Sequence, residues 1–101
     1  MVKRSKDWNA GLAKDLRDFE FAAQFIIATI EEGASLQEAL GKVIRLYGIH
    51  EFSEVAKMAS PNIIRAINTR YNPTQKTLCL LLKPFGLTIS VRPEYFAREP
   101  A

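Results

Sequence analysis

The segment that most constrains the fold of this 101-residue chain runs from residue 48 to residue 72. Its apolar residues form two short helical patterns, so the segment predicts two helices joined by a tight turn at residues 57–59. Three residues of the first helix would point inward: Phe52, Val55 and Ala56. In the second helix, Ile63 and Ile67 form an i, i+4 pair that would anchor it to its neighbours.

These anchors would leave polar side chains near the exposed N-terminal half of the second helix: Ser60, Asn62 and Arg65. In DNA-reading helix-turn-helix units, this part of the recognition helix contacts the base edges. Asn can form two hydrogen bonds with adenine, and Arg can form two with guanine. Pro61 suits the first helical turn, where its missing N–H would have had no partner. The segment therefore predicts a helix-turn-helix for double-stranded DNA over about residues 50–69.

The charge of the chain is uneven along its length. The formal net charge is +3, yet residues 1–33 hold five basic and six acidic residues, whereas residues 57–93 hold six basic residues and no acidic one. Such a basic segment attracts a polyanion through counterion release. It contains five further candidates for DNA binding: Lys57, Thr69, Arg70, Asn72 and Lys76. Two alternatives stay open, namely a solvated basic face without function and an Asn72 that only caps a helix.

Further helices are predicted on both sides of the helix-turn-helix, which makes the fold all-α with five helices. Apolar residues at helical spacing predict helices over residues 18–31 and 36–47. Ser35 and Glu38 form a capping box for the second of these. A fifth helix is predicted to follow Asn72, which would act as its N-cap.

The residues after the fifth helix alternate between apolar and polar types, so residues 87–92 are predicted to form a short β-strand. A lone strand in a helical domain would have an unpaired edge, and we expect it to pair with the same strand of a second copy. The dimerisation residues would be Leu87, Ile89 and Val91. Residues 16–92 are thus expected to form a DNA-binding domain, between a partly flexible arm at residues 1–15 and a tail at residues 93–101.

The composition argues against several other classes of function. No apolar run approaches the roughly 20 residues that a membrane span needs, and the basic N-terminus has no apolar stretch behind it, so we expect a cytoplasmic protein. Cys79 and His50 are each alone, which leaves the usual zinc ligands incomplete. The sequence offers no paired catalytic carboxylates, activated nucleophile or Gly-rich phosphate loop. We therefore expect no enzymatic activity, cofactor, metal or small-molecule ligand.

Short motifs lie at the ends of the predicted helices: Glu31-Glu32-Gly33, Tyr47-Gly48, Asn72-Pro73-Thr74, Thr77-Leu78 and Phe85-Gly86-Leu87. In this order, over roughly residues 16–92, they resemble the addiction-module antidote proteins, the HigA-like antitoxins of bacterial toxin–antitoxin pairs. The resemblance implies a lambda-repressor-like helix-turn-helix fold. It also implies a homodimer that represses its own operon, and that neutralises a RelE/HigB-type ribonuclease toxin as the antitoxin of a type II module.

The candidate surface for the toxin is the N-terminal region, chosen for its location and aromatic content: Trp8, Leu12, Phe19, Phe21 and Phe25. Two alternatives to the antitoxin hypothesis stay open. A stand-alone or phage-derived repressor without a toxin would share every DNA-binding feature. A module that uses its helices only to bind protein would have weak and unspecific affinity for DNA.

The chain departs from the family pattern around the turn. Ser53 stands where the family usually has Ala, Lys57 where it has Gly, and Ala59 where it has a Ser or Thr cap. A lysine in a left-handed backbone conformation costs on the order of 1 kcal/mol relative to glycine. We therefore also consider a turn shifted by one residue, in which Ser60 caps the second helix instead of contacting a base.

Overall fold

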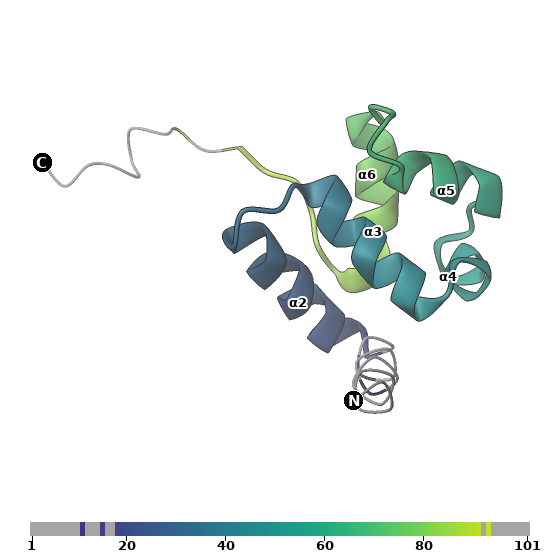
Figure 1. Cartoon of the computed structure of the whole chain (residues 1–101), viewed down its shortest axis with the longest axis horizontal. Helices are drawn as coiled ribbons and strands as arrows, with labels where there is room; N and C mark the ends of the chain where they lie inside the picture. The colour runs from purple at the N-terminus through teal and green to yellow at the C-terminus, as the bar shows by residue number, and fades with distance from the viewer. Residues whose placement is uncertain (1–10, 12–14, 16–17, 92, 94–101) are drawn as a thin grey trace, which may run out of the picture.

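The computed structural model describes residues 11, 15, 18–91 and 93 (Figure 1). Its elements are α2 (Phe19–Glu31), α3 (Leu36–Tyr47), α4 (Ile49–Ala56), α5 (Ser60–Ile67), α6 (Gln75–Leu82) and the short 3₁₀ helix η1 (Lys83–Phe85). The predicted all-α class is confirmed for the described residues. Trp8 and Leu12, with most of the expected arm and tail, lie outside them. None of the helices in this part of the chain has the length and apolarity that crossing a bilayer requires.

Helix α3 is the central element, with α2 on one side of it and α4, α5 and α6 on the other (Figure 1). Four of its residues are fully buried, because apolar side chains recur along one face at helical spacing: Ala39, Leu40, Val43 and Ile44. The surrounding elements complete the core with Ala22, Ala23, Ile26, Phe52, Ile63, Ala66, Ile67, Leu81, Leu82 and Phe85. Ile63 and Ile67 are therefore buried, as expected for the i, i+4 pair that was predicted to anchor the second helix of residues 48–72.

Local signals set the ends of α2 and α3. The Asp18 carboxylate accepts a hydrogen bond from the Glu20 N–H at 3.0 Å, which begins α2. The predicted capping box starts α3, with Ser35 Oγ accepting from the Glu38 N–H at 3.1 Å. Gly48 separates α3 from α4 at φ 111°, a backbone conformation that L side chains rarely adopt.

The turn between α4 and α5 contains a residue in the left-handed conformation. Lys57 has φ 55° and ψ 47°, and it is the one non-glycine residue with positive φ in the described part of the chain. Ala59 occupies the N-cap position of α5 without a side-chain hydrogen bond, and Ser60 is the first helical residue. The shifted turn with Ser60 as cap is therefore wrong. Phe52 before the turn and Ile63 after it are both buried, and their burial determines which residues form the turn. The free energy gained by burying either side chain exceeds the cost of about 1 kcal/mol for the left-handed conformation of Lys57.

Four aromatic rings join α2, α3, α4 and η1 in a closed cluster. The centroids lie 5.6 Å apart for Phe19 and Tyr47, 5.7 Å for Tyr47 and Phe52, 5.5 Å for Phe52 and Phe85, and 5.5 Å for Phe85 and Phe19. Such pairs stabilise by roughly 0.5–1.5 kcal/mol beyond the area they bury. The cluster holds α4 against α3 and η1 through Phe52. The turn and α5 come directly after α4 in the chain.

Helix α4 presents only a narrow face to this core. Phe52 is fully buried and Ala56, one turn later, packs against the core. Val55 is 38% exposed, so the prediction that it points inward is wrong. Phe52 and Ala56 are four residues apart and fill the buried face of this eight-residue helix. Val55, three residues after Phe52, therefore lies at the edge of that face.

Residues 87–91 follow η1 without regular secondary structure in the single chain. Leu87 and Ile89 are half-buried and pack against the core, Thr88 and Ser90 between them are exposed, and Val91 is 94% exposed. The predicted alternation is thus present in the burial of residues 87–90 and ends at Val91. The strand itself, which needs the ladder of a second copy, stays a prediction.

Candidate nucleic-acid interface

Helix α5 divides cleanly into a buried and an exposed face. Ile63, Ala66 and Ile67 are buried, whereas Pro61, Asn62, Ile64 and Arg65 are exposed and Ser60 is half-buried. The division follows from the helical period, since positions 63, 66 and 67 share one side. Two of the predicted base-contacting residues, Asn62 and Arg65, are therefore accessible to a large ligand.

A hollow of about 500 Å³ lies between α5 and the start of α6. Its lining residues are Met58, Asn62, Arg65, Ala66, Tyr71, Asn72, Pro73, Thr74, Thr77 and Leu80. The structure thus brings together three residues that the sequence marked as DNA-binding: Asn62, Arg65 and Asn72. Their amide and guanidinium groups offer donors, and the amides also acceptors, at one concave surface.

One flank of α3 holds the end of α5 next to this hollow. Gln37, Gly41 and Arg45 follow each other at intervals of four residues, so they lie on one side of α3. The Gln37 side-chain nitrogen lies 2.7 Å from the carbonyl oxygen of Ala66, and Arg45 Nη2 lies 3.5 Å from that of Ile67. Gly41 is buried between them, where a Cβ would lie 3.5 Å from Ile67. A small residue inside a helix is a sequence signal of such close packing, but nothing in the sequence identified Gln37.

Gln37 also fixes the loop that follows α5. Its side-chain nitrogen lies 3.0 Å from the carbonyl oxygen of Asn68 and 3.1 Å from that of Tyr71. Within the loop, the Asn68 side chain accepts from the Arg70 N–H at 2.9 Å, and the Asn68 carbonyl accepts from the Tyr71 N–H at 2.9 Å. The loop that carries the candidates Thr69, Arg70 and Asn72 therefore has a defined backbone.

The start of α6 differs from the prediction. Thr74 is the N-cap, because its hydroxyl accepts from the Thr77 N–H at 3.1 Å, and the helix begins at Gln75. The prediction of Asn72 as cap is wrong, since Thr74 provides the capping oxygen two residues later. Asn72 instead lines the hollow with an exposed side chain.

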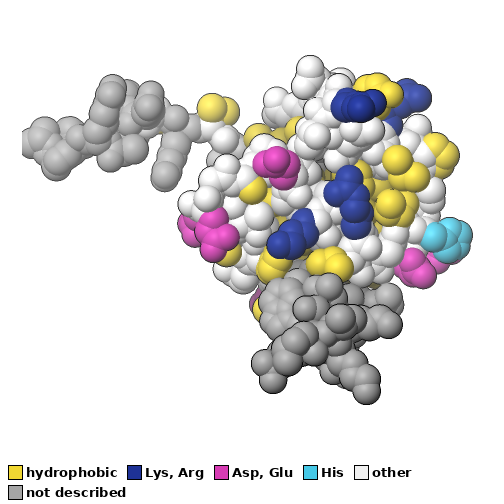
Figure 2. All heavy atoms as spheres, viewed as in Figure 1, with side chains coloured by type: hydrophobic (Ala, Val, Ile, Leu, Met, Phe, Trp, Pro, Cys, Tyr) yellow, Lys and Arg dark blue, Asp and Glu magenta, His cyan; other side chains and the backbone are white. Residues whose placement is uncertain are grey.

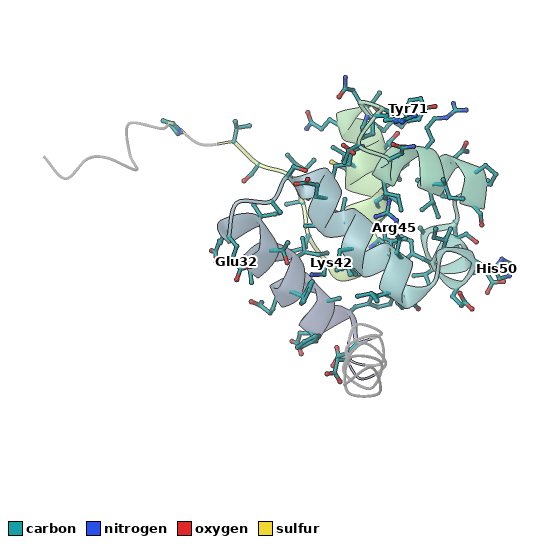
Figure 3. All side chains as sticks on the ribbon, viewed as in Figure 1. Glu32, Lys42, Arg45, His50 and Tyr71 are labelled. Atoms are coloured by element: carbon teal, nitrogen blue, oxygen red, sulfur yellow. The ribbon has the colours of Figure 1, made fainter. Side chains whose placement is uncertain are left out.

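Arg65 lies over the ring of Tyr71, which was not among the predicted site residues. Its Cζ atom is 5.9 Å from the centroid of the Tyr71 ring, and that ring is 51% exposed. Figure 3 places Tyr71 near the loop between α5 and α6, at the opposite end of this view from α2. This distance is within the range of cation–π interactions.

The other candidates for DNA binding lie around the hollow without lining it. Thr69, Arg70 and Lys76 are exposed. Lys57 is also exposed and borders a separate hollow of about 480 Å³, together with Phe19, Val55, Ala56, Leu80, Lys83 and Pro84.

Charged side chains are spread over this face of the molecule. Figure 2 shows acidic side chains at the outer edge of α2, near the start of α3 and beside the histidine, and basic side chains over α3 and at the end where α5 and α6 meet. In the part of the chain that the structure describes, the one contact found between a basic and an acidic side chain joins His50 Nε2 to Glu54 Oε2 on α4, at 3.9 Å and well exposed. The basic residues of the candidate interface are thus not neutralised by carboxylates of the described residues.

The described residues of the set predicted to bind a toxin all lie on α2, where the Phe21 and Phe25 ring centroids are 6.5 Å apart. Phe19 is half-buried in the aromatic cluster, and Phe25 is half-buried beneath the Lys42 ammonium, 5.5 Å from its ring centroid. Phe21 is 41% exposed. Among the described members of the set, Phe21 is therefore the most accessible.

The predicted dimerisation residues lie beside α2. A hollow of about 340 Å³ is lined by Ile26, Ile27, Ile30, Leu36, Leu82, Leu87, Thr88, Ile89 and Ser90. Leu87 and Ile89 contribute to its wall, whereas Val91 extends away into solvent. Apolar side chains of α2 and of residues 87–91 thus share one partly exposed surface.

Comparison of the chain with protein-family models, with curated proteins and with solved structures finds no match.

Proposed function

We propose that the chain binds double-stranded DNA in a sequence-specific manner, with α4 and α5 acting as a lambda-repressor-like helix-turn-helix. The observation that carries this proposal is the position of Asn62 and Arg65. Both are exposed on α5 and line one hollow, within a segment that has six basic residues and no acidic one. An α-helix fits the major groove, where Asn and Arg distinguish adenine and guanine by paired hydrogen bonds.

The contacts that hold α5 in place also favour sequence-specific DNA binding. Its buried side chains and its contacts with Gln37, Gly41 and Arg45 give the exposed face a fixed orientation relative to the loop at residues 68–72. Base recognition needs such orientation, because phosphate contacts set the register of the protein and side chains read the bases from there. Arg70 and Lys76 are suitably exposed for the phosphate contacts.

We further propose that the protein is the antitoxin of a type II module and represses its own operon as a homodimer. This part rests on the family resemblance of the sequence. The toxin would be a RelE/HigB-type ribonuclease, and the exposed Phe21 would contribute to its binding surface. The partly exposed apolar surface around Leu87 and Ile89 would pair with a second copy.

The DNA part can be tested by selecting duplexes from a randomised pool with the full chain. The wild-type protein should enrich a defined sequence, and Asn62→Ala and Arg65→Ala should each relax its preference at particular base pairs. Lys42→Ala is a suitable control, because Lys42 is an exposed cation on α3 and lines none of the three hollows. Enrichment of no sequence by the wild-type protein would contradict the proposal.

The antitoxin part can be tested with the open reading frame next to the gene. Expression of that frame alone should arrest growth, and co-expression of this chain should restore it. If the neighbouring product is harmless, the toxin partner is refuted, and a stand-alone repressor remains.

A further inference from the structure

Tyr71 is an exposed aromatic residue at the hollow that holds the proposed DNA-reading residues. We propose that Tyr71 is a positioning residue for Arg65, and that the pair recognises a guanine. The tyrosine ring would cover one face of the guanidinium and leave its N–H edge free for the two acceptors of the base. This inference rests on the proposed function and deepens it, since it assigns one base contact and a residue that controls it.

The position of the ring follows from contacts of the backbone. Gln37 lies within hydrogen-bond distance of the Tyr71 carbonyl oxygen, at 3.1 Å, and the Tyr71 N–H donates to the Asn68 carbonyl oxygen at 2.9 Å. Both backbone groups of Tyr71 are therefore engaged. The same Gln37 nitrogen contacts the carbonyl oxygen of Ala66, the residue after Arg65, at 2.7 Å. One side chain of α3 thus contacts both the residue that carries the ring and the residue that follows Arg65.

The contact between the two side chains has the chemistry that such positioning requires. The Arg65 Cζ atom lies over the ring, 5.9 Å from its centroid. A guanidinium on an aromatic face keeps its donors in a planar fork, which matches a pair of acceptors. In the described residues no carboxylate pairs with Arg65, so no internal acceptor competes for that fork. A lysine in its place would offer a point charge without this planar geometry.

Holding the long side chain of Arg65 should raise affinity, because less rotational freedom is lost on binding. A cation–π contact at an exposed site corresponds to a change of about two- to fivefold in affinity. The gain in affinity should apply to the cognate sequence, in which the guanidinium donors of Arg65 bind the guanine. A phosphate offers the same pair of acceptors, but a phosphate contact would contribute equally to every sequence.

The test measures the affinity of full-length variants for three probes. The first is the duplex selected from a randomised pool by the wild-type chain, the second is the same duplex with 7-deazaguanine in place of guanine, and the third is a scrambled duplex of equal composition. The variants are Tyr71→Ala, Tyr71→Phe, Arg65→Ala and the double variant Tyr71→Ala/Arg65→Ala, each with its thermal unfolding recorded.

Tyr71→Ala should weaken binding to the selected duplex about two- to fivefold and leave binding to the scrambled duplex unchanged. Tyr71→Phe keeps the ring and should bind as the wild-type chain does. In the Arg65→Ala background, Tyr71→Ala should have no further effect. Replacement of guanine by 7-deazaguanine removes the N7 acceptor, and should weaken the wild-type chain more than the Arg65→Ala variant.

Other results would overturn the inference. If Tyr71→Phe loses as much affinity as Tyr71→Ala, the hydroxyl and not the ring is the active group. If Tyr71→Ala weakens selected and scrambled duplexes alike, and 7-deazaguanine has no effect, the pair contacts phosphate. If the wild-type chain selects a sequence and Tyr71→Ala binds it normally, the positioning role alone fails. If the wild-type chain selects no sequence, the proposed function fails together with the inference.

Discussion

The side-chain nitrogen of Gln37 lies 2.7 Å from the carbonyl oxygen of Ala66, so the first turn of α3 is joined to the last turn of α5, 29 residues further along the chain. The same nitrogen reaches the carbonyl oxygens of Asn68 and Tyr71 at 3.0 and 3.1 Å. Two of these contacts are partly buried. Gln37 thus couples the central helix to both the proposed recognition helix and the loop after it.

Gln37→Ala should lower the free energy of unfolding by roughly 1–3 kcal/mol, because partly buried carbonyl oxygens would lose their donor. Urea denaturation of both proteins measures this difference. Gln24→Ala is a matched control, since Gln24 is an exposed glutamine on α2 and should change the stability by no more than about 0.5 kcal/mol. Equal stability of the two variants would contradict the bridging role of Gln37.

Lys57→Gly should stabilise the protein by on the order of 1 kcal/mol, because Lys57 has φ 55° and glycine adopts this conformation without steric cost. The gain should appear as a higher midpoint in urea. Lys42→Gly removes the same charge within α3 and should instead destabilise by about 1 kcal/mol, because glycine is a poor helix former. Destabilisation by Lys57→Gly would show that its backbone is not left-handed in solution.

Arg65→Ala and Arg70→Ala remove the same group from different places and should differ in effect. Arg65→Ala should cost roughly 1–3 kcal/mol on the cognate sequence and little on other DNA. Arg70→Ala should weaken binding to all sequences alike and reduce the magnitude of the salt slope by about one, as expected for a phosphate contact. Titrations of cognate and scrambled duplexes at several salt concentrations separate the two effects. Identical profiles for the two variants would refute the assignment of roles.

Val91→Asp should weaken the proposed homodimer, because Val91 continues the apolar alternation of Leu87 and Ile89 and is 94% exposed in the single chain. A charge in an apolar strand pairing is unfavourable, whereas the monomer has no contact there to lose. Sedimentation at a series of concentrations gives the dissociation constant. Ser90→Asp places the same charge at the neighbouring polar position and should have the smaller effect. If Val91→Asp leaves association unchanged, residues 87–91 do not form the dimer contact as proposed.

The helices could be predicted from the sequence because their signals are local. The capping box at Ser35 and the i, i+4 pair of Ile63 and Ile67 depend on spacing within one turn, and the structure confirms both. The predicted cap at Asn72 was wrong because Asn72 and Thr74 both suit an N-cap, and only the hydrogen bond to the Thr77 N–H distinguishes them. The inward position of Val55 was wrong because periodicity cannot define the edge of a buried face in so short a helix.

The candidate site could be predicted only in part. Asn62, Arg65 and Asn72 were identified from residue type and position, and the fold gathers them at one hollow. Tyr71 and Gln37 were missed because their roles arise from contacts across the fold, over 29 to 34 residues for Gln37. Phe19 was assigned to a partner surface by its location and aromatic character, and its ring also contributes to the internal cluster with Tyr47 and Phe85. Long-range packing of this kind leaves no periodic signal in the chain.

The proposed function depends above all on sequence-specific recognition of DNA by α5. The most direct measurement is the affinity of the full chain for a duplex from the region upstream of its own gene, compared with a scrambled duplex of equal composition at physiological salt. We predict a preference of about a thousandfold or more for the upstream duplex, and its loss in the Asn62→Ala/Arg65→Ala double variant. Equal affinity of the wild-type chain for both duplexes would contradict sequence-specific recognition by α5.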